Sequence, residues 1–191
     1  MRTIAALAAL TLCAALWASR TELVEGNPAG DVKVVIYTDL QCPDCLRLRS
    51  LLDDKILPKY GKRVAFVHRD FPLGKHDWAR QAAIAGRWVT EQNPQLALVF
   101  HREIMSEQLH ITSATLKPWL VEFAVRNRLD PKGITDALSD KRLDALVDQD
   151  YQAAIARGVT AAPTMIIGGR KFSQTILYED VAKALDVELG R

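Results

Sequence analysis

The sequence predicts an α/β fold in which an all-helical insertion separates a strand–helix–strand unit from a C-terminal β-hairpin and a final helix. Three observations support this prediction. A β-branched segment runs into Cys42-Pro43-Asp44-Cys45, which has the features of a helix start. Apolar residues then recur at helical spacing over about 76–157. Finally, Gly168-Gly169 divides two short strand-like segments.

Length and composition fit a single globular domain. The chain has 191 residues, of which 49% are hydrophobic and 25% are charged, enough to bury one core. The formal net charge of +2 creates no strong field, so no nucleic-acid partner is expected. The three cysteines, Cys13, Cys42 and Cys45, are too few for a disulfide-stapled scaffold.

The first 31 residues are expected to precede the folded domain. Residues 4–18 are apolar apart from Thr11, and Arg2 lies before them. A membrane span needs about 20 such residues, so this shorter run is typical of a signal peptide. We expect residues 1–19 to be a signal peptide, with an uncleaved N-terminal anchor as the alternative. Residues 20–31 are interpreted as a linker and 32–191 as the domain.

A strand, a helix and a second strand open the domain. Residues 32–38 are rich in β-branched and aromatic side chains, as in a buried central strand. The helix that begins at Cys42 is expected to run to about Ile56, and Pro58 is expected to end it. Residues 64–68 form the second predicted strand. The dithiol therefore lies at the carboxyl end of the first strand, where chemistry collects in open α/β sheets.

Helices are expected throughout the insertion at 76–157. Asp130-Pro131 is typical of a helix start and Gly158 of a helix end. Strand character returns on both sides of Gly168-Gly169, which suits a tight hairpin because both turn residues need positive φ. The pattern over 178–189 predicts the last helix.

Cys42 and Cys45 are predicted to be a redox dithiol. With Cys42 as the N-cap and Pro43 at the first helical position, the free N–H groups of the first turn favour the Cys42 thiolate. We expect Cys42 to be the exposed nucleophile and Cys45 the resolving thiol, with no cofactor beyond the Cys42–Cys45 disulfide. A structural disulfide, or a zinc ion held by two such motifs across a dimer, is the alternative.

Three motifs resemble the DsbA-like thiol–disulfide oxidoreductases, which have a thioredoxin fold with a helical insertion. They are Asp-Leu-Gln-Cys-Pro-Asp-Cys at 39–45, Arg-Asp-Phe-Pro-Leu at 69–73 and Gly-Val-Thr-Ala-Ala-Pro-Thr at 158–164. The resemblance runs from about residue 26 to the C-terminus. It implies a cis peptide at Ala162-Pro163, beside which a substrate segment adds as a strand. It places Pro43, Asp44, Ala162 and Pro163 at the substrate site.

The resemblance also implies a function and partners. The expected activity is disulfide exchange with exported, cysteine-containing proteins in the periplasm or another extracytoplasmic compartment, with a redox partner that resets the dithiol. Membrane contact is expected only through an uncleaved N-terminal anchor. A reductase or isomerase, and a non-catalytic peptide-binding module of the same fold, are the alternatives, because these residues do not set the direction of exchange.

Two positions depart from the family pattern. Relatives commonly carry a buried acid six residues before the first cysteine, where this chain has Ile36. Asp39 or Asp44 is therefore expected to help move the proton of Cys45. Asp44 is also expected to oppose the Cys42 thiolate and so make the disulfide less oxidising. The four histidines are interpreted as surface or packing residues: His68, His76, His101 and His110.

Overall fold

The computed structural model describes residues 22–191. The expected signal peptide or anchor, and Cys13 with it, lies outside the described residues. Within them, no helix combines the length and the apolar character needed to cross a membrane.

A five-stranded mixed sheet forms the centre of the fold, in the order β1-β3-β2-β4-β5. Its strands are β1 (Leu23–Gly26), β2 (Val32–Thr38), β3 (Val64–Asp70), β4 (Thr164–Ile167) and β5 (Arg170–Ser173). Only β2 and β3 are parallel neighbours, and the other pairs are antiparallel. The parallel register sets Ile36 beside His68.

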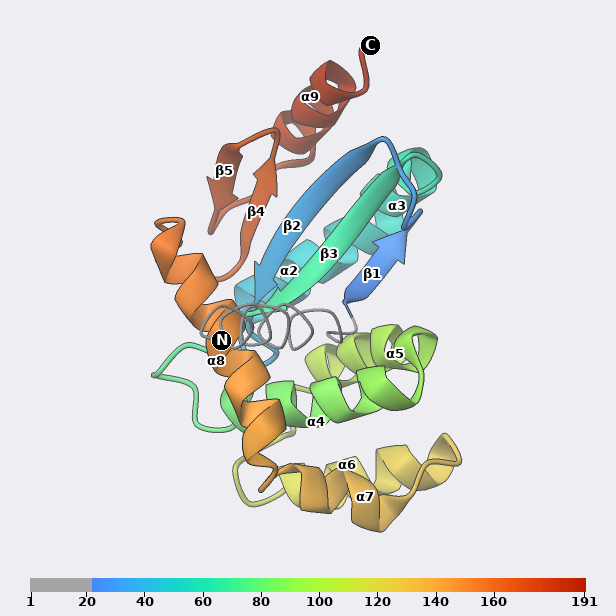
Figure 1. Ribbon diagram of the computed structural model, residues 1–191, viewed down its shortest axis with the longest axis vertical. Helices are drawn as coiled ribbons and strands as arrows, with labels where there is room; N and C mark the ends of the chain where they lie inside the picture. Colours follow the sequence, from blue (N-terminus) through green and yellow to red (C-terminus); the bar gives the residue numbers. More distant parts are fainter. Residues whose placement is uncertain (1–21) are drawn as a thin grey trace, which may run out of the picture.

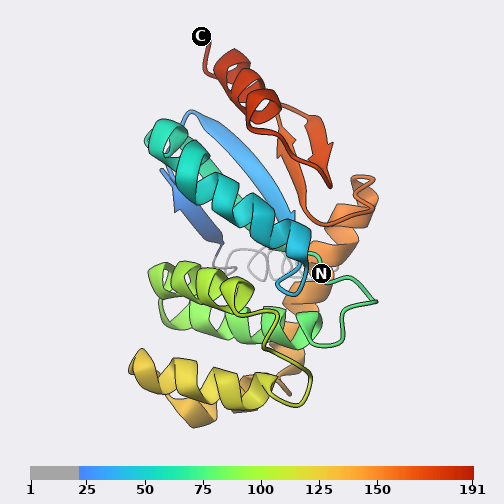
Figure 2. The same cartoon turned by 180° about the vertical axis from the view of Figure 1, so that it is seen from behind.

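Helices cover the sheet and extend from one end of it. The first helical run comprises α2 (Pro43–Leu51), the π-helical segment η1 (Leu52–Ile56) and α3 (Leu57–Tyr60), and the insertion comprises α4 (Ala79–Gln92), α5 (Pro94–Ser106), α6 (Leu116–Arg126), α7 (Pro131–Ala137) and α8 (Lys141–Ala156). The first run packs with the last helix, α9 (Tyr178–Glu188), on one face of the sheet (Figure 2). The helices α4 to α7 lie beyond the end toward which β2 and β3 point, and α8 leads back toward β4 (Figure 1). The predicted α/β fold with a helical insertion is confirmed.

The segment expected to be a linker contains a strand. β1 pairs antiparallel with β3 along its whole length. Leu23 and Glu25 both point inward, and each is 5% exposed. A four-residue strand with a buried carboxylate has no clear hydrophobic alternation. The interpretation of 20–31 as a linker was therefore wrong for Leu23–Gly26.

The first helical run continues past Pro58 to Tyr60, although Pro58 was expected to end it. Proline cannot donate the backbone hydrogen bond that an α-helix needs at this point. In η1 the backbone hydrogen bonds span five residues instead of four: the N–H of Leu57 donates to the carbonyl of Leu52. This π-type bonding lets the chain continue through a residue that has no N–H.

The glycines predicted to end a helix or to form the hairpin turn have positive φ angles. Gly168 and Gly169 have φ of 52° and 80°, and Gly158 ends α8 with φ of 67°. The hairpin between β4 and β5 is therefore confirmed. Because β4 pairs antiparallel with β2, with Thr164 opposite Tyr37, the segment before β4 lies at the carboxyl end of β2.

Candidate active site

The dithiol lies where β2 ends and α2 begins. Cys42 is the N-cap, with φ −84° and ψ 123°, and Pro43 is the first residue of the helix. The Cys42 carbonyl accepts hydrogen bonds from the N–H groups of Cys45 and Leu46, at 3.0 and 3.2 Å. The predicted helix start is confirmed, and both cysteines are free thiols.

Cys42 is less accessible than expected. It is 5% exposed, because the segment before β4 folds over it. The Cys42 thiol donates to the carbonyl oxygen of Ala162, 3.6 Å away, and the Ala162-Pro163 peptide is cis, as the resemblance implies. The prediction that Cys42 is exposed was wrong, because the residue that covers it lies 120 positions away along the chain.

The environment of Cys42 favours its thiolate. The hydrogen bond from the Cys45 thiol is the largest influence and lowers the pKa of Cys42 to about 6, against the effect of burial. The backbone N–H of Cys45 and the charge of His76 lower this pKa further, whereas Asp39 raises it. The reactive form of Cys42 is therefore well populated at neutral pH.

An ion pair weakens the electrostatic effect expected of Asp44. Asp44 forms an ion pair with Arg47 on the next turn of α2, and the Arg47 side chain is largely exposed. This cation offsets the Asp44 charge, and solvent screens both groups. The carboxylate that opposes the Cys42 thiolate is Asp39.

Cys45 is the inner thiol of the pair. It is 1% exposed, and its sulfur accepts a hydrogen bond from the Asp39 N–H at 3.3 Å. Burial first, and then the neighbouring Cys42, raises the pKa of Cys45 well above its usual value. The two thiols therefore differ strongly in acidity although they are only three residues apart.

The Asp39 carboxylate fixes the turn before the dithiol. It accepts hydrogen bonds from the backbone N–H groups of Gln41 and Leu73, each at 2.7 Å, and lies 2.8 Å from Nδ1 of His76. These contacts join the end of β2 to the loop after β3. Asp39 therefore acts as a turn residue here, and His76, interpreted from the sequence as a surface or packing residue, lies at the site.

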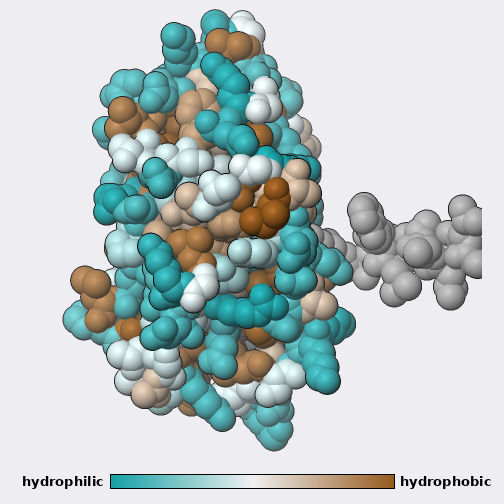
Figure 3. Space-filling model, turned by 90° about the vertical axis from the view of Figure 1, so that its left-hand side faces the viewer, coloured by the Kyte–Doolittle hydropathy of each residue, from teal (hydrophilic) through white to brown (hydrophobic). Residues whose placement is uncertain are grey.

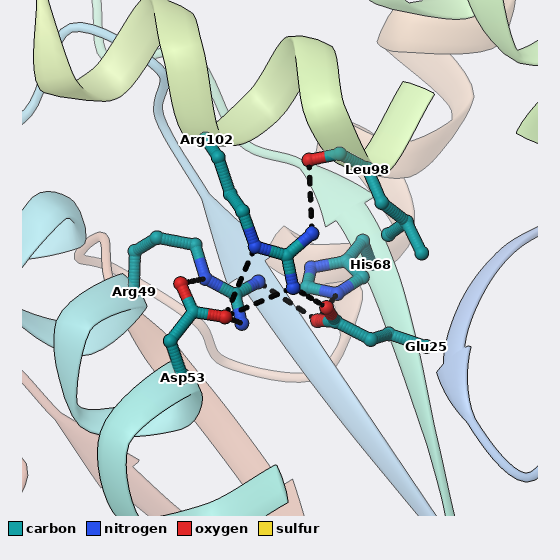
Figure 4. Close-up of polar contacts among 6 residues, drawn as sticks. All are labelled: Glu25, Arg49, Asp53, His68, Leu98 and Arg102. Carbon is teal, nitrogen blue, oxygen red and sulfur yellow. Dashed lines mark hydrogen bonds and ion pairs between the residues drawn. The ribbon is translucent and has the colours of Figure 1, made fainter. Parts of the chain in front are cut away.

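A buried ionic cluster lies on the inner side of the site. Glu25 accepts from Arg49 at 2.8 Å and lies 3.2 Å from Nε2 of His68. It also pairs with Arg102, and Asp53 binds both arginines (Figure 4). Sequence reasoning missed this cluster because its members come from β1, α2, η1, β3 and α5. The one available signal was His68 directly after the four apolar residues that open β3.

The surface around the site is mixed in polarity. On the side that carries β5, α8 and the loop after β3, small apolar patches alternate with polar side chains (Figure 3). Among residues 22–191, no group of three or more His, Cys, Asp or Glu side chains is arranged to hold a metal ion.

Comparison with known proteins places the chain in a family. A family model described as thioredoxin matches residues 18–187. The chain belongs to the thioredoxin family. A solved member of this fold, α-DsbA1 from Wolbachia pipientis, superposes with a TM-score of 0.76 at 19% identity, covering 88% of this chain and 91% of that one. The fold is therefore the DsbA-like form, with the helical insertion.

Sequence relatives within the family differ in their length. "Probable disulfide bond formation protein D" from Bacillus cereus is 24% identical over 183 residues, which is 92% of this chain and 82% of the relative. "Na(+)/H(+) antiporter NhaA 3" from Salinispora tropica is 30% identical over 149 residues, 78% of this chain. This chain spans 22% of that antiporter's length.

Proposed function

We propose that this chain is a thiol–disulfide oxidoreductase that exchanges disulfides with exported, cysteine-containing proteins through Cys42 and Cys45. The observation that carries the proposal is the asymmetry of the pair. Cys42, with a pKa of about 6, lies against the Ala162 carbonyl at the carboxyl end of β2. Cys45 is buried behind it, with a raised pKa.

The exchange proceeds through a mixed disulfide. A substrate thiolate attacks the Cys42 sulfur of the Cys42–Cys45 disulfide, and Cys45 leaves as a thiolate that takes up a proton. A second substrate thiolate then attacks the substrate sulfur bound to Cys42. The substrate gains a disulfide, Cys42 leaves as a thiolate, and two electrons remain on the enzyme dithiol. The reverse sequence reduces a substrate disulfide.

The acidity of Cys42 favours the oxidising direction. A thiol with a lowered pKa is a better leaving group, and its thiolate stabilises the reduced enzyme. This differs from the weaker oxidant expected from Asp44, because Arg47 pairs with that carboxylate. An oxidant of this kind needs a redox partner that removes two electrons and restores the disulfide. The dithiol itself carries the exchange, without a further cofactor.

The substrate-binding site is formed by Pro43 and Asp44 at the start of α2 and by Ala162 and Pro163 before β4. An extended substrate segment would replace the contact between the Cys42 thiol and the Ala162 carbonyl with strand-like backbone hydrogen bonds. A substrate paired in this way would bring its sulfur toward Cys42 from the side on which the Ala162 carbonyl contacts the thiol.

Export fits this chemistry. The apolar N-terminal segment 1–19 would direct residues 32–191, together with β1, into an extracytoplasmic compartment, either as a cleaved signal or as an anchor. Disulfides form and persist in such compartments. The name of the Bacillus relative, a probable disulfide bond formation protein, agrees with this assignment.

Redox equilibrium and trapping test the proposal together. The chain without residues 1–19 is equilibrated with glutathione, and its reduction potential is expected well above the about −270 mV of thioredoxin. Cys42→Ser should abolish oxidation of a reduced, unfolded protein, and the Cys42 thiolate of Cys45→Ser, given a protein substrate that contains a disulfide, should accumulate the mixed disulfide as one substrate thiolate leaves. A potential near that of thioredoxin would overturn the oxidising direction. Full biological activity of a variant that lacks both thiols would favour a non-catalytic binding module.

A further inference from the structure

A small cavity lies directly behind the inner thiol. Thr38, Cys45, Arg49, His68 and His101 line it together with apolar side chains, and about 10 Å³ is open to the centre of a water-sized sphere. This is about the space that one water molecule needs, and several of the lining side chains can form hydrogen bonds. The cavity therefore offers Cys45 a polar neighbour on the side away from the substrate.

Cys45 needs such a neighbour. In the exchange proposed above, Cys45 must lose its proton before it can attack the Cys42 sulfur, and must regain one when it leaves. It is 1% exposed, so bulk water does not reach it directly. Burial also raises the pKa of Cys45, which leaves little thiolate at neutral pH without a nearby base.

The two acids near the dithiol are engaged elsewhere. The Asp39 carboxylate binds two backbone N–H groups and His76. Asp44 pairs with Arg47 at the outer surface of α2. Neither Asp39 nor Asp44 lines the cavity. The expectation that one of them moves the Cys45 proton therefore has no geometric support.

His68 is the group in the cavity wall that is set up to accept a proton. Its Nε2 lies 3.2 Å from the Glu25 carboxylate. Burial alone would raise the pKa of Glu25, but His68 and Arg49 hold it well below its usual range. The ionised carboxylate accepts the Nε2–H, and this fixes the tautomer in which Nδ1 is free to accept.

The charged and titratable groups of the cluster around His68 come from four elements besides β3. Glu25 lies on β1, Arg49 on α2, Asp53 on η1, and Arg102 with His101 on α5 (Figure 4). Two arginines offset two carboxylates, and Glu25 is the carboxylate that directly contacts His68. Burial, followed by His68 and Arg49, lowers the pKa of His101 well below its usual value, which disfavours a proton on His101.

We propose that His68, oriented by Glu25, exchanges the proton of the Cys45 thiol through one water molecule in this cavity. This inference rests on the proposed function. In the resolving step, the Cys45 thiol gives its proton to the water as the water gives one to Nδ1 of His68. The Cys45 thiolate attacks the Cys42 sulfur, the Cys42–Cys45 bond forms, and the bond to the substrate sulfur breaks. The substrate leaves as a thiolate, and the opposite direction follows the same path.

The rate of the resolving step tests His68. Wild-type protein and His68→Gln are loaded with glutathione on Cys42 by reaction with oxidised glutathione at low pH, and its release is followed by mass spectrometry across pH. A positioned base contributes about 100-fold or more. We therefore expect release from His68→Gln to be about 100-fold slower near neutral pH and to rise about tenfold per pH unit, as hydroxide replaces the histidine. Wild-type release should be much less dependent on pH.

Two controls separate this role from structural damage. Met105→Leu changes the cavity wall without changing its proton chemistry and conserves volume, so its release rate should stay within about twofold of wild type. Glu25→Gln keeps the size of the side chain but weakens the hydrogen bond that fixes the His68 tautomer. Release of glutathione from this variant should therefore be slower than from wild type and should depend steeply on pH. If His68→Gln unfolds, the pH profile of Glu25→Gln decides the question.

The outcomes are distinct. A His68→Gln or Glu25→Gln protein that folds and releases glutathione with the wild-type rate and pH profile would overturn the proton path but leave the proposed function intact. A wild-type protein whose Cys42 does not react with oxidised glutathione, or does not release it, would overturn the proposed function itself.

Discussion

Asp39 and His76 act in opposite directions on the same thiolate. The Asp39 carboxylate raises the pKa of Cys42 and His76 lowers it, while the two side chains bind each other at 2.8 Å. A small change in this pair therefore alters the acidity of Cys42 without touching either sulfur. The same pair holds the turn that positions the dithiol, so its electrostatic and structural roles have to be measured separately.

We expect His76→Asn to raise the pKa of Cys42 above about 6, by roughly one pH unit at most. The variant removes the cation, and it also leaves Asp39 without that counter-charge. Thiolate absorbance measured against pH in the reduced protein checks this result. His110→Asn, an exposed histidine, is the matched control. A Cys42 pKa that His76→Asn does not change would contradict the role given to His76.

Asp44→Asn should shift the Cys42 pKa less than His76→Asn does. Asp44 already pairs with Arg47, and solvent screening leaves such a pair little long-range effect. The same absorbance titration measures both variants. A larger effect from Asp44→Asn would restore the view that the residue between the cysteines controls their acidity.

At the scale of elements, the Glu25 cluster joins β1 to two helices, α2 and α5. Arg49 from α2 and Arg102 from α5 both bind the Glu25 carboxylate. Their exposure differs: the Arg49 side chain is 6% exposed and that of Arg102 is 37% exposed. Breaking a buried ion pair leaves an unpaired charge in the protein, whereas a partly exposed partner can be replaced by water.

Arg49→Ala should therefore lower the free energy of unfolding by about 3 kcal/mol or more. Arg102→Ala should lower it by about 1 kcal/mol, as expected for a partly solvated pair. Urea unfolding of both variants, compared at the same pH, measures the difference. An equal decrease in the free energy of unfolding for both variants would show that burial does not determine how much each arginine contributes to stability.

At the scale of the whole molecule, a second ionic cluster joins the helical insertion to the sheet. Arg87 on α4 binds Asp70 at the end of β3 and Asp150 on α8. All three residues are buried. This contact and the apolar core that lies beneath Cys42, Cys45 and the insertion make the dithiol part of one packed unit, so its ionisation is linked to global stability.

The stability of the reduced protein should rise with pH between about 6 and about 9. The folded pKa of Cys42 is about 6 against an ordinary value of 9.0, so the unfolded chain binds more protons in this window. The added stability is present above the unfolded pKa and is lost as pH falls through the folded pKa. Urea unfolding of reduced wild type and Cys42→Ser checks this between about pH 6 and about pH 8, where burial keeps Cys45 protonated even without its contact with Cys42. A constant difference between them would contradict the lowered pKa.

Local patterns were enough to predict most of the fold. The helix start at Cys42, the hairpin at Gly168-Gly169 and the end of α8 at Gly158 each depend on a few adjacent residues with special backbone needs. They were predicted from those residues and are observed. The strand Leu23–Gly26 was missed because its identity depends on pairing with β3, which no local pattern reports.

The sequence by itself determined the dithiol, the helix that begins at it and the order of elements around it, because these follow from short-range backbone preferences and apolar periodicity. Only the tertiary structure decided the surroundings of the two sulfurs. The Ala162 carbonyl over Cys42, the Asp39–His76 pair, and the His68–Glu25 pair behind Cys45 join segments far apart in the chain. Acidity and proton access depend on distance and burial in space, and so they appear only when those segments meet.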